Sequence, residues 1–272
     1  MTAVSVTSPA RPAPFGRISP GKAIRNGLTL GWRNVTQLKH SPEKLLDTTL
    51  IPIVFLVLFL YVFGGAVAGS THAYLQQLLP GMIAQMAMFA TMGLGTVINE
   101  DIHRGVFDRF RSLPIARSAP LIGAVVGDTV RFVTTMTMLT GFGMLLGFRF
   151  HTDAVKLLAA YGLAYLAYLS FCWISLLIGL MAASPAATQG FTAMWTLPLT
   201  FGSSIFIPNT GSMPRWLHAW VTVNPATHLA DSLRALTLGG AAGNHVWYTI
   251  SWSVGIIVVA FPLGLAMYSR RV

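Results

Sequence analysis

The strongest constraint in this sequence is the absence of charge from most of its length. No Asp, Glu, Lys or Arg occurs in residues 48–99, 132–148, 157–214 or 235–269. A membrane-spanning helix needs about 20 predominantly apolar residues, so these tracts predict two, one, two and one spans in turn. The sequence therefore predicts an all-α integral membrane protein with six transmembrane helices. The expected spans are residues 47–65, 78–98, 121–147, 155–181, 188–207 and 245–268.

The composition excludes several classes of protein. Charged residues make up 10% of the chain, against roughly 25% in soluble globular domains, which argues against a water-soluble enzyme. The net charge of +10 does not indicate nucleic-acid binding, because most of the chain is expected to lie in lipid. The single cysteine, Cys172, excludes an intrachain disulfide and a CxxC metal site. His218, His228 and His245 are dispersed, and we expect no metal site and no catalytic cluster.

The N-terminal 40 residues have two parts. Residues 1–20 are rich in proline and small polar residues, and we expect a disordered cytoplasmic tail. In residues 21–40, apolar side chains recur every three or four positions, which predicts an amphipathic helix in the headgroup plane. A soluble helix packed on another element is the alternative. Residues 21–272 would then form a single transmembrane domain.

The basic residues predict the orientation. With the N-terminus in the cytoplasm, four of the 18 Lys and Arg residues fall outside, namely Arg149, Lys156, Arg215 and Arg234. The other 14 fall inside, and cytoplasmic segments carry the excess of Lys and Arg in membrane proteins. We therefore expect both termini in the cytoplasm of a multi-pass plasma (bacterial inner) membrane protein.

Residues 99–119 form the long cytoplasmic loop of this topology. Its charges are spaced for pairing along a helix, and Phe107 and Phe110 form an apolar knob among them. Gly105 permits a sharp bend, and Pro114 ends the helix. This pattern suits docking into a groove on a soluble partner, although a solvated loop folded back onto lipid fits equally well. The candidate contact residues are Glu100, Asp101, Arg104, Gly105, Phe107, Asp108, Phe110, Arg111 and Pro114.

The external segment, residues 208–244, is apolar but interrupted by prolines. Asn224 and Pro225 predict a helix start, and Gly239 and Gly240 predict its end. A helix of that length, roughly 20 Å, is too short to cross the roughly 30 Å hydrocarbon core. We expect a re-entrant helical hairpin at the outer end of a pathway. Asp231 and Arg234 are three apart and can pair there.

Five residues are candidates for a substrate pathway. Gln85, Met88 and Met92 share one face of the second expected span, and flexible methionine surfaces accommodate varied apolar ligands. Methionine is also a common filler, so ordinary packing remains open. Asp128 and Arg131, three apart in the third span, either line a vestibule or dimer seam, or mark the helix end as an interfacial pair.

Two motifs carry a resemblance to a known family. They are the loop Glu100-Asp101 to Pro114 with Arg117, and Asn224-Pro225 followed by Asp231-Ser232-Leu233-Arg234. Together they resemble the membrane subunits of ABC-2-type ATP-binding-cassette exporters, and within them the daunorubicin-resistance permeases. The resemblance implies a type V exporter-like fold. Residues 21–40 would be its connecting helix, 99–119 its coupling loop and 208–240 its re-entrant helices.

The same resemblance implies the partners. Gly21-Lys22-Ala23 lacks the spacing and the Ser or Thr of a Walker A loop, so ATP and magnesium are expected on a separate ATPase subunit, in two copies. Six spans are half of such an exporter, and we expect a homodimer, with a heterodimer as the alternative. The expected substrates are hydrophobic drugs, antibiotics or lipids. A secondary transporter or channel for small apolar solutes is the rival function, and an intramembrane enzyme is disfavoured because no catalytic set occurs in the spans.

Overall fold

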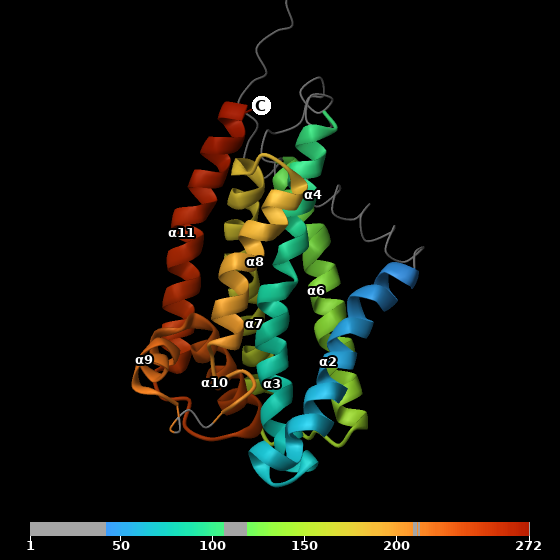
Figure 1. Ribbon diagram of the computed structural model, residues 1–272, viewed down its shortest axis with the longest axis vertical. Coiled ribbons are helices and arrows are strands. Elements are labelled where there is room, and N and C mark those ends of the chain that lie inside the picture. The colour runs from blue at the N-terminus through green and yellow to red at the C-terminus, as the bar shows by residue number, and fades with distance from the viewer. Residues whose placement is uncertain (1–41, 106–118, 209–210, 212, 272) are drawn as a thin grey trace, which may run out of the picture.

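In this computed structural model, residues 42–105, 119–208, 211 and 213–271 are described. Their regular secondary structure is α-helical, which confirms the all-α prediction for this part of the chain, and the long helices run side by side (Figure 1). The 1–20 tail, the 21–40 helix and the loop residues Phe107, Asp108, Phe110, Arg111 and Pro114 lie outside the described residues. The helices are α2 (Pro42–Ala68), α3 (Thr71–Phe89), α4 (Thr91–His103), α6 (Ala119–Leu145), α7 (Ala154–Met181), α8 (Pro185–Phe201), α9 (Arg215–Val223), α10 (Pro225–Leu238) and α11 (His245–Arg271).

Five helical segments among the described residues are long and apolar enough to cross a membrane, where the sequence predicted six. The expected fifth span, residues 188–207, corresponds to α8, which has only 17 residues. It ends at Phe201 because Gly202 leaves the helical conformation, although apolar residues continue to Ile207. The five segments are Leu50–Ala68, Thr71–His103, Leu121–Leu145, Ala154–Met181 and His245–Tyr268.

The second of these segments, Thr71–His103, is interrupted once. Ala90 separates α3 from α4, a one-residue break that the predicted continuous span 78–98 did not contain. Ala90 itself keeps a helical φ of −56° and ψ of −31°, and its amide donates to the Met86 carbonyl at 3.0 Å. The Thr91 hydroxyl donates to the Met88 carbonyl at 2.7 Å beside the break. The break is therefore local, and Thr71–His103 remains one candidate span.

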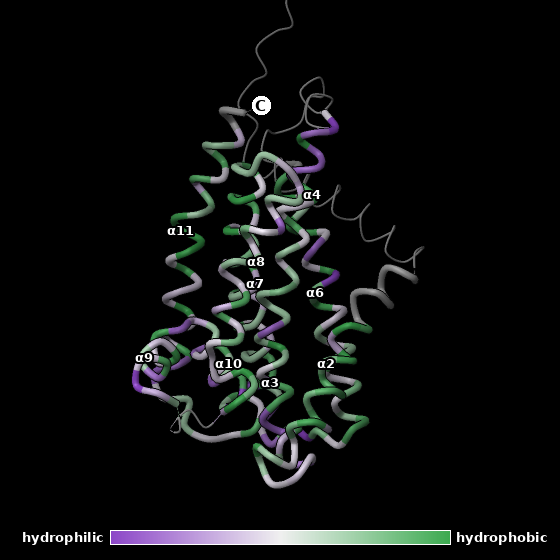
Figure 2. The backbone as a smooth tube through the Cα atoms, viewed as in Figure 1, coloured by the Kyte–Doolittle hydropathy of each residue, from purple (hydrophilic) through white to green (hydrophobic). Residues whose placement is uncertain are grey.

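Helix α7 and the segment Thr71–His103 form the centre of the bundle. In each, 67% of the most apolar stretch is buried, against 22% for Leu50–Ala68 and 17% for His245–Tyr268. Helices α2 and α11 are therefore peripheral, and their exposed apolar side chains suit contact with lipid. Figure 2 shows apolar residues along most of the bundle, and hydrophilic residues gathered mainly near its ends and connections.

Helices α4 and α7 approach each other closely enough to bring their backbones into contact. A Cβ added at Gly179 would lie 2.3 Å from the Gly95 carbonyl oxygen, and one at Gly95 would lie 2.3 Å from the Ser175 carbonyl oxygen. The Ser175 hydroxyl donates to the Thr91 carbonyl at 2.6 Å and accepts from the Gly95 amide at 3.2 Å. Small residues at helix crossings permit this approach in membranes, where packing rather than water drives association.

Two short helices occupy the segment for which a hairpin was predicted. The Asn224 side chain accepts from the Ala226 amide and caps α10, Pro225 is its first residue, and Gly239 ends it with a φ of 86°. These features confirm the predicted start and end of the helix. In Figure 1, α9 and α10 lie at the same end of the bundle as the α2–α3 and α6–α7 connections, opposite the C-terminus.

Candidate functional site

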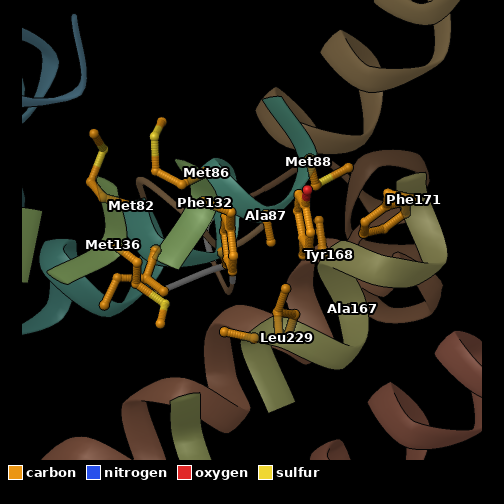
Figure 3. Packing of buried hydrophobic residues seen from close by; sticks show 14 of the residues in the cluster. Met82, Met86, Ala87, Met88, Phe132, Met136, Ala167, Tyr168, Phe171 and Leu229 are labelled. Carbon is orange, nitrogen blue, oxygen red and sulfur yellow. The ribbon is translucent and has the colours of Figure 1, made fainter. Parts of the chain in front are cut away.

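A polar cluster lies near the middle of α6, where this helix meets α7. Arg131 and Asp128 form an ion pair between Nη2 and Oδ1. The Tyr168 hydroxyl on α7 donates to Asp128 Oδ2 at 2.6 Å. Tyr168 is fully buried, and its ring stacks on that of Phe132 with centroids 4.3 Å apart (Figure 3). The carboxylate thus has two donors, which offset the cost of placing it within the membrane.

The Arg131 side chain also contacts the break between α3 and α4. Its Nη2 donates to the Ala90 carbonyl at 3.0 Å. A Cβ added at Gly93 would lie 3.5 Å from the same nitrogen, so the guanidinium lies flat against the first turn of α4. The cluster therefore connects α6 to α7 and to the break between α3 and α4.

The far end of α4 is fixed to the end of α7. Asn99 Nδ2 donates to the Gly179 and Ala182 carbonyls at 2.8 and 2.9 Å, and the His103 ring nitrogens lie 2.9 and 3.1 Å from the Asn99 and Ala183 carbonyls, to one of which a neutral ring can donate. Glu100 and Arg104 form a half-exposed ion pair of 3.3 Å, one helical turn apart, as their spacing predicted.

The first residues of the candidate coupling loop lie at the end of α4 and directly after it. Asp101 is partly buried, and Gly105 has a φ of 66°, the left-handed conformation that glycine adopts at low cost. Of the nine candidate loop residues, the structure thus positions Glu100, Asp101, Arg104 and Gly105. They lie at the end of the bundle where α7 is connected to α8. The bonds of Asn99 and His103 attach this end of α4 to the end of α7.

The methionine face of α3 is part of the packed interior. Gln85 is 3% exposed and its Oε1 has no partner, while Met88 is fully buried and accepts a bond from Thr200 Oγ1 to its sulfur at 3.7 Å. Met92, on α4, is partly buried. The structure therefore groups Gln85 and Met88 in the interior and places Asp128 and Arg131 separately on α6. Figure 3 shows Met82, Met86, Met88 and Met136 packed around the same core.

Among the charged side chains of the α9–α10 segment, Arg234 makes the most hydrogen bonds. It is 7% exposed, pairs with Asp231 at 2.8 Å, and donates to the Ser204 and Ile205 carbonyls at 2.8 Å each and to the Gln77 carbonyl at 3.0 Å. Pairing of Asp231 with Arg234 is confirmed, whereas the backbone partners were not predicted. Arg234 thus fastens α10 to α3 and to the chain that follows α8.

Asn224 makes a second attachment between the same elements. Its Nδ2 donates to the Leu199 and Gly202 carbonyls at 2.8 and 2.7 Å. The last turn of a helix leaves carbonyls without intrahelical partners, and here the Asn224 side chain at the start of α10 supplies a donor to the Leu199 carbonyl in the last turn of α8. The end of α8 and the α9–α10 segment therefore form one hydrogen-bonded unit.

Two histidines that are dispersed in the sequence meet between α10 and α11. The Nδ1 atoms of His228 and His245 lie 3.1 Å apart, so one ring donates to the other. The Tyr248 ring lies 4.9 Å from that of His228. Burial and the neighbouring His245 lower the pKa of His228, while Asp231 acts in the opposite direction. Protonation of His228 in the folded protein is therefore disfavoured.

We expect this pair to make stability depend on pH. Because the pKa of His228 is lower in the folded state than the unfolded value of about 6.5, its contribution to stability is complete above that pH and is lost as the pH falls below it. Thermal unfolding measured between pH 7.5 and 5 should show a fall that His228→Gln reduces. His218→Gln, at an exposed site, should leave the fall intact. An unchanged pH profile in His228→Gln would disprove the role of the pair.

Several residues that organise this region were missed in the sequence. Gly95, Asn99, Ser175 and Gly179 hold α4 on α7, and Tyr168 holds Asp128. The available signal was the spacing of small residues four apart, Thr91 to Gly95 and Ser175 to Gly179, which is typical of close helix contacts in membranes. No comparable signal marks Tyr168, because its partner lies on another helix.

Comparison with known proteins agrees with these features. Residues 26–238 match the family described as ABC-2 type transporter. The chain is 38% identical to the daunorubicin resistance ABC transporter permease protein DrrB1 of Streptomyces coeruleorubidus, over 92% of this chain and 88% of that one. It is 29% identical to the doxorubicin resistance ABC transporter permease protein DrrB of Mycobacterium tuberculosis, over 84% and 83% of the two chains. The chain therefore belongs to the ABC-2 type transporter family, as a membrane permease subunit and not as an enzyme.

Proposed function

We propose that this chain is the permease subunit of an ATP-driven exporter, which moves hydrophobic drugs, antibiotics or lipid-like molecules out of the cytoplasm or the inner leaflet. A separate ATPase subunit, present in two copies, would bind ATP and magnesium. Two copies of the permease would complete the transporter. The names of the similar permeases, which refer to daunorubicin and doxorubicin resistance, support the substrate class. The ABC-2 family membership supports the ATPase partner.

The observation that carries this proposal is the attachment of α4. This helix contacts α7 along its length and ends at the segment that resembles the coupling loop. In contrast, α3 is fastened to Arg234 through the Gln77 carbonyl. The break at Ala90 lies between these two attachments. A push on the loop would therefore move α4 together with α7, while α3 is attached to the α9–α10 segment.

The proposed topology has six crossings, with α8 as the fifth. At 1.5 Å per residue, a helix of this length reaches roughly 25 Å, and the chain from Gly202 to Ile207 extends it toward the α9–α10 end. Non-helical backbone is tolerated at this depth when it is buried in protein, and Ser203, Ser204, Ile205 and Phe206 are buried. Both termini would be cytoplasmic, and the α9–α10 segment would be re-entrant from outside.

Labelling of introduced cysteines tests this orientation. In a Cys172→Ser background, Gly211→Cys and Gly240→Cys should both react with a membrane-impermeant thiol reagent added to intact cells. Leu113→Cys and Arg271→Cys should react only after the cells are opened, since we place them in the cytoplasm. Labelling of Gly211→Cys and Gly240→Cys from opposite sides would mean that the segment crosses the membrane, which contradicts the topology.

A double substitution tests the coupling loop. Phe107→Ala with Phe110→Ala should reduce copurification of the ATPase subunit at least tenfold, because aromatic anchors carry most of the binding energy at interfaces of this kind. Membrane insertion should be unchanged. Phe55→Ala with Phe63→Ala on the exposed face of α2 is the matched control and should retain the ATPase. Normal copurification and transport of a daunorubicin probe by the loop variant would refute the assignment.

A further inference from the structure

An open apolar groove of about 550 Å³ lies along α11, with α7 at its deeper end. Tyr248, Trp252, Gly255 and Val259 line it from α11, and Ile174 and Leu177 line it from α7. Gly255 is exposed, and a Cβ added there would meet no atom within 4 Å, so the groove has open space beside this glycine. The groove is separate from the polar cluster on α6 and from the α4–α7 crossing.

The position and length of the groove fit one leaflet of a bilayer. It begins at Tyr248, close to the start of the span His245–Tyr268, and reaches Val259. These eleven residue steps along a helix cover roughly 17 Å. Half of the hydrocarbon core is about 15 Å thick. The groove therefore extends from the membrane surface at the α9–α10 end to about the bilayer midplane.

The chemistry of the groove also favours a lipid chain. Its lining residues are apolar apart from three polar groups near its outer end, the Tyr248 phenol, the Ser251 hydroxyl and the Trp252 indole N–H. Tyr248 and Trp252 line its outer end and are 49% and 48% exposed, and Trp247, the residue before Tyr248, is 69% exposed. Trp and Tyr favour the level of the lipid headgroups. A solute with charged or numerous polar groups would find no partners deeper in the groove.

We propose that this groove binds one acyl chain of a phospholipid from the leaflet at the α9–α10 end. The chain enters beside Tyr248 and ends near Val259, while the headgroup stays at the level of Trp247. The bound chain fills the space over Gly255 and supports α11, the least buried of the candidate spans. This proposal depends on membrane embedding, but not on the direction of transport or on the identity of the exported substrate.

Photolabelling tests the proposal. The full-length chain is placed in bilayers that contain phosphatidylglycerol with a diazirine either near the carbonyl or near the end of one acyl chain. After irradiation, the first probe should label residues 248–252 and the second residues 256–260. Gly255→Leu should reduce both adducts at least fivefold. Gly162→Leu, on an exposed part of α7 where a Cβ also meets no atom, is the matched control and should reduce neither.

Three results would overturn the proposal. Labelling of the groove that is no stronger than labelling of the exposed residues Met194 and Leu197 on α8 would indicate general lipid contact only. A reversed order of depth would place the lipid in the opposite leaflet. Efficient disulfide formation between two copies carrying Val259→Cys, in a Cys172→Ser background, would assign the groove to a second copy of the chain.

Discussion

Replacing Gly179 with leucine is expected to separate α4 from α7 and to cost about 3 kcal/mol of stability or more, because the side chain has no space between two backbones. The nearest atom to the added Cβ is a carbonyl oxygen at 2.3 Å, which cannot rotate away as a side chain could. The change would also disturb the Asn99 bond to the Gly179 carbonyl. Thermal unfolding of the purified protein would measure the loss, which corresponds to a fall of roughly 10 °C.

The control for this prediction lies on the same helix. Gly162→Leu makes the same chemical change and gains the same helix propensity, but its Cβ meets no atom within 4 Å. The difference between the two variants therefore isolates the close contact between α4 and α7. Equal unfolding temperatures would show that the two helices separate easily, and would remove the basis for treating them as one moving unit.

Replacing Arg131 with leucine is expected to abolish transport while leaving the ATPase subunit bound. Removing one member of a fully buried ion pair costs about 3–5 kcal/mol, and we expect a smaller loss here because Arg131 is 30% exposed, although the Asp128 carboxylate would keep only the Tyr168 donor. The substitution also removes the bond to the Ala90 carbonyl, which connects α6 to the break. We expect at least a tenfold lower rate of daunorubicin-probe export from cells, with normal copurification of the ATPase.

Two further variants distinguish the effect of the Asp128 and Arg131 charges from the effect of the hydrogen bonds that the Arg131 side chain makes. Arg131→Lys keeps the charge, but its ammonium lies closer to the backbone than Nη2, the nitrogen that contacts both Asp128 and Ala90, so export should be only partly restored. Asp128→Asn with Arg131→Gln removes both charges and should recover stability without recovering transport. Lys156→Leu, at an exposed cation, is the control for loss of charge. Full export by the uncharged double variant would exclude a role for the cluster in coupling.

Hydropathy and turn residues predicted much of the helical framework. The prediction 155–181 differs from α7, Ala154–Met181, by one residue, because a long apolar run with polar ends leaves little choice. Asn224, Pro225 and Gly239 define α10 through local bonds that are readable in sequence. The end of α8 was placed too late, since the Ser203 hydroxyl binds the Thr200 carbonyl and the Ile205 amide in a turn that hydropathy cannot detect.

The candidate site was only partly predictable, because its decisive contacts join distant parts of the chain. The spacing of Asp128 and Arg131 predicted their pairing, which the structure confirms. It could not indicate that Tyr168, forty residues away, would donate to Asp128, or that Arg131 would bind Ala90. A helical period shows which residues share a face, but not which other helix that face meets. The same limit hid the contact between His228 and His245.

The bonds of Arg234 have a consequence for how the protein is made. Its acceptors, on Gln77, Ser204, Ile205 and Asp231, all precede it in the chain, so the ribosome synthesises every one of them first. When the guanidinium emerges from the insertion machinery, its acceptors are already at the membrane, and the charge never needs to remain in lipid without partners. Vectorial synthesis from the N-terminus thus suits the assembly of this segment, whereas a circular permutant that began at Pro225 would expose the arginine before its acceptors on Gln77, Ser204 and Ile205 existed.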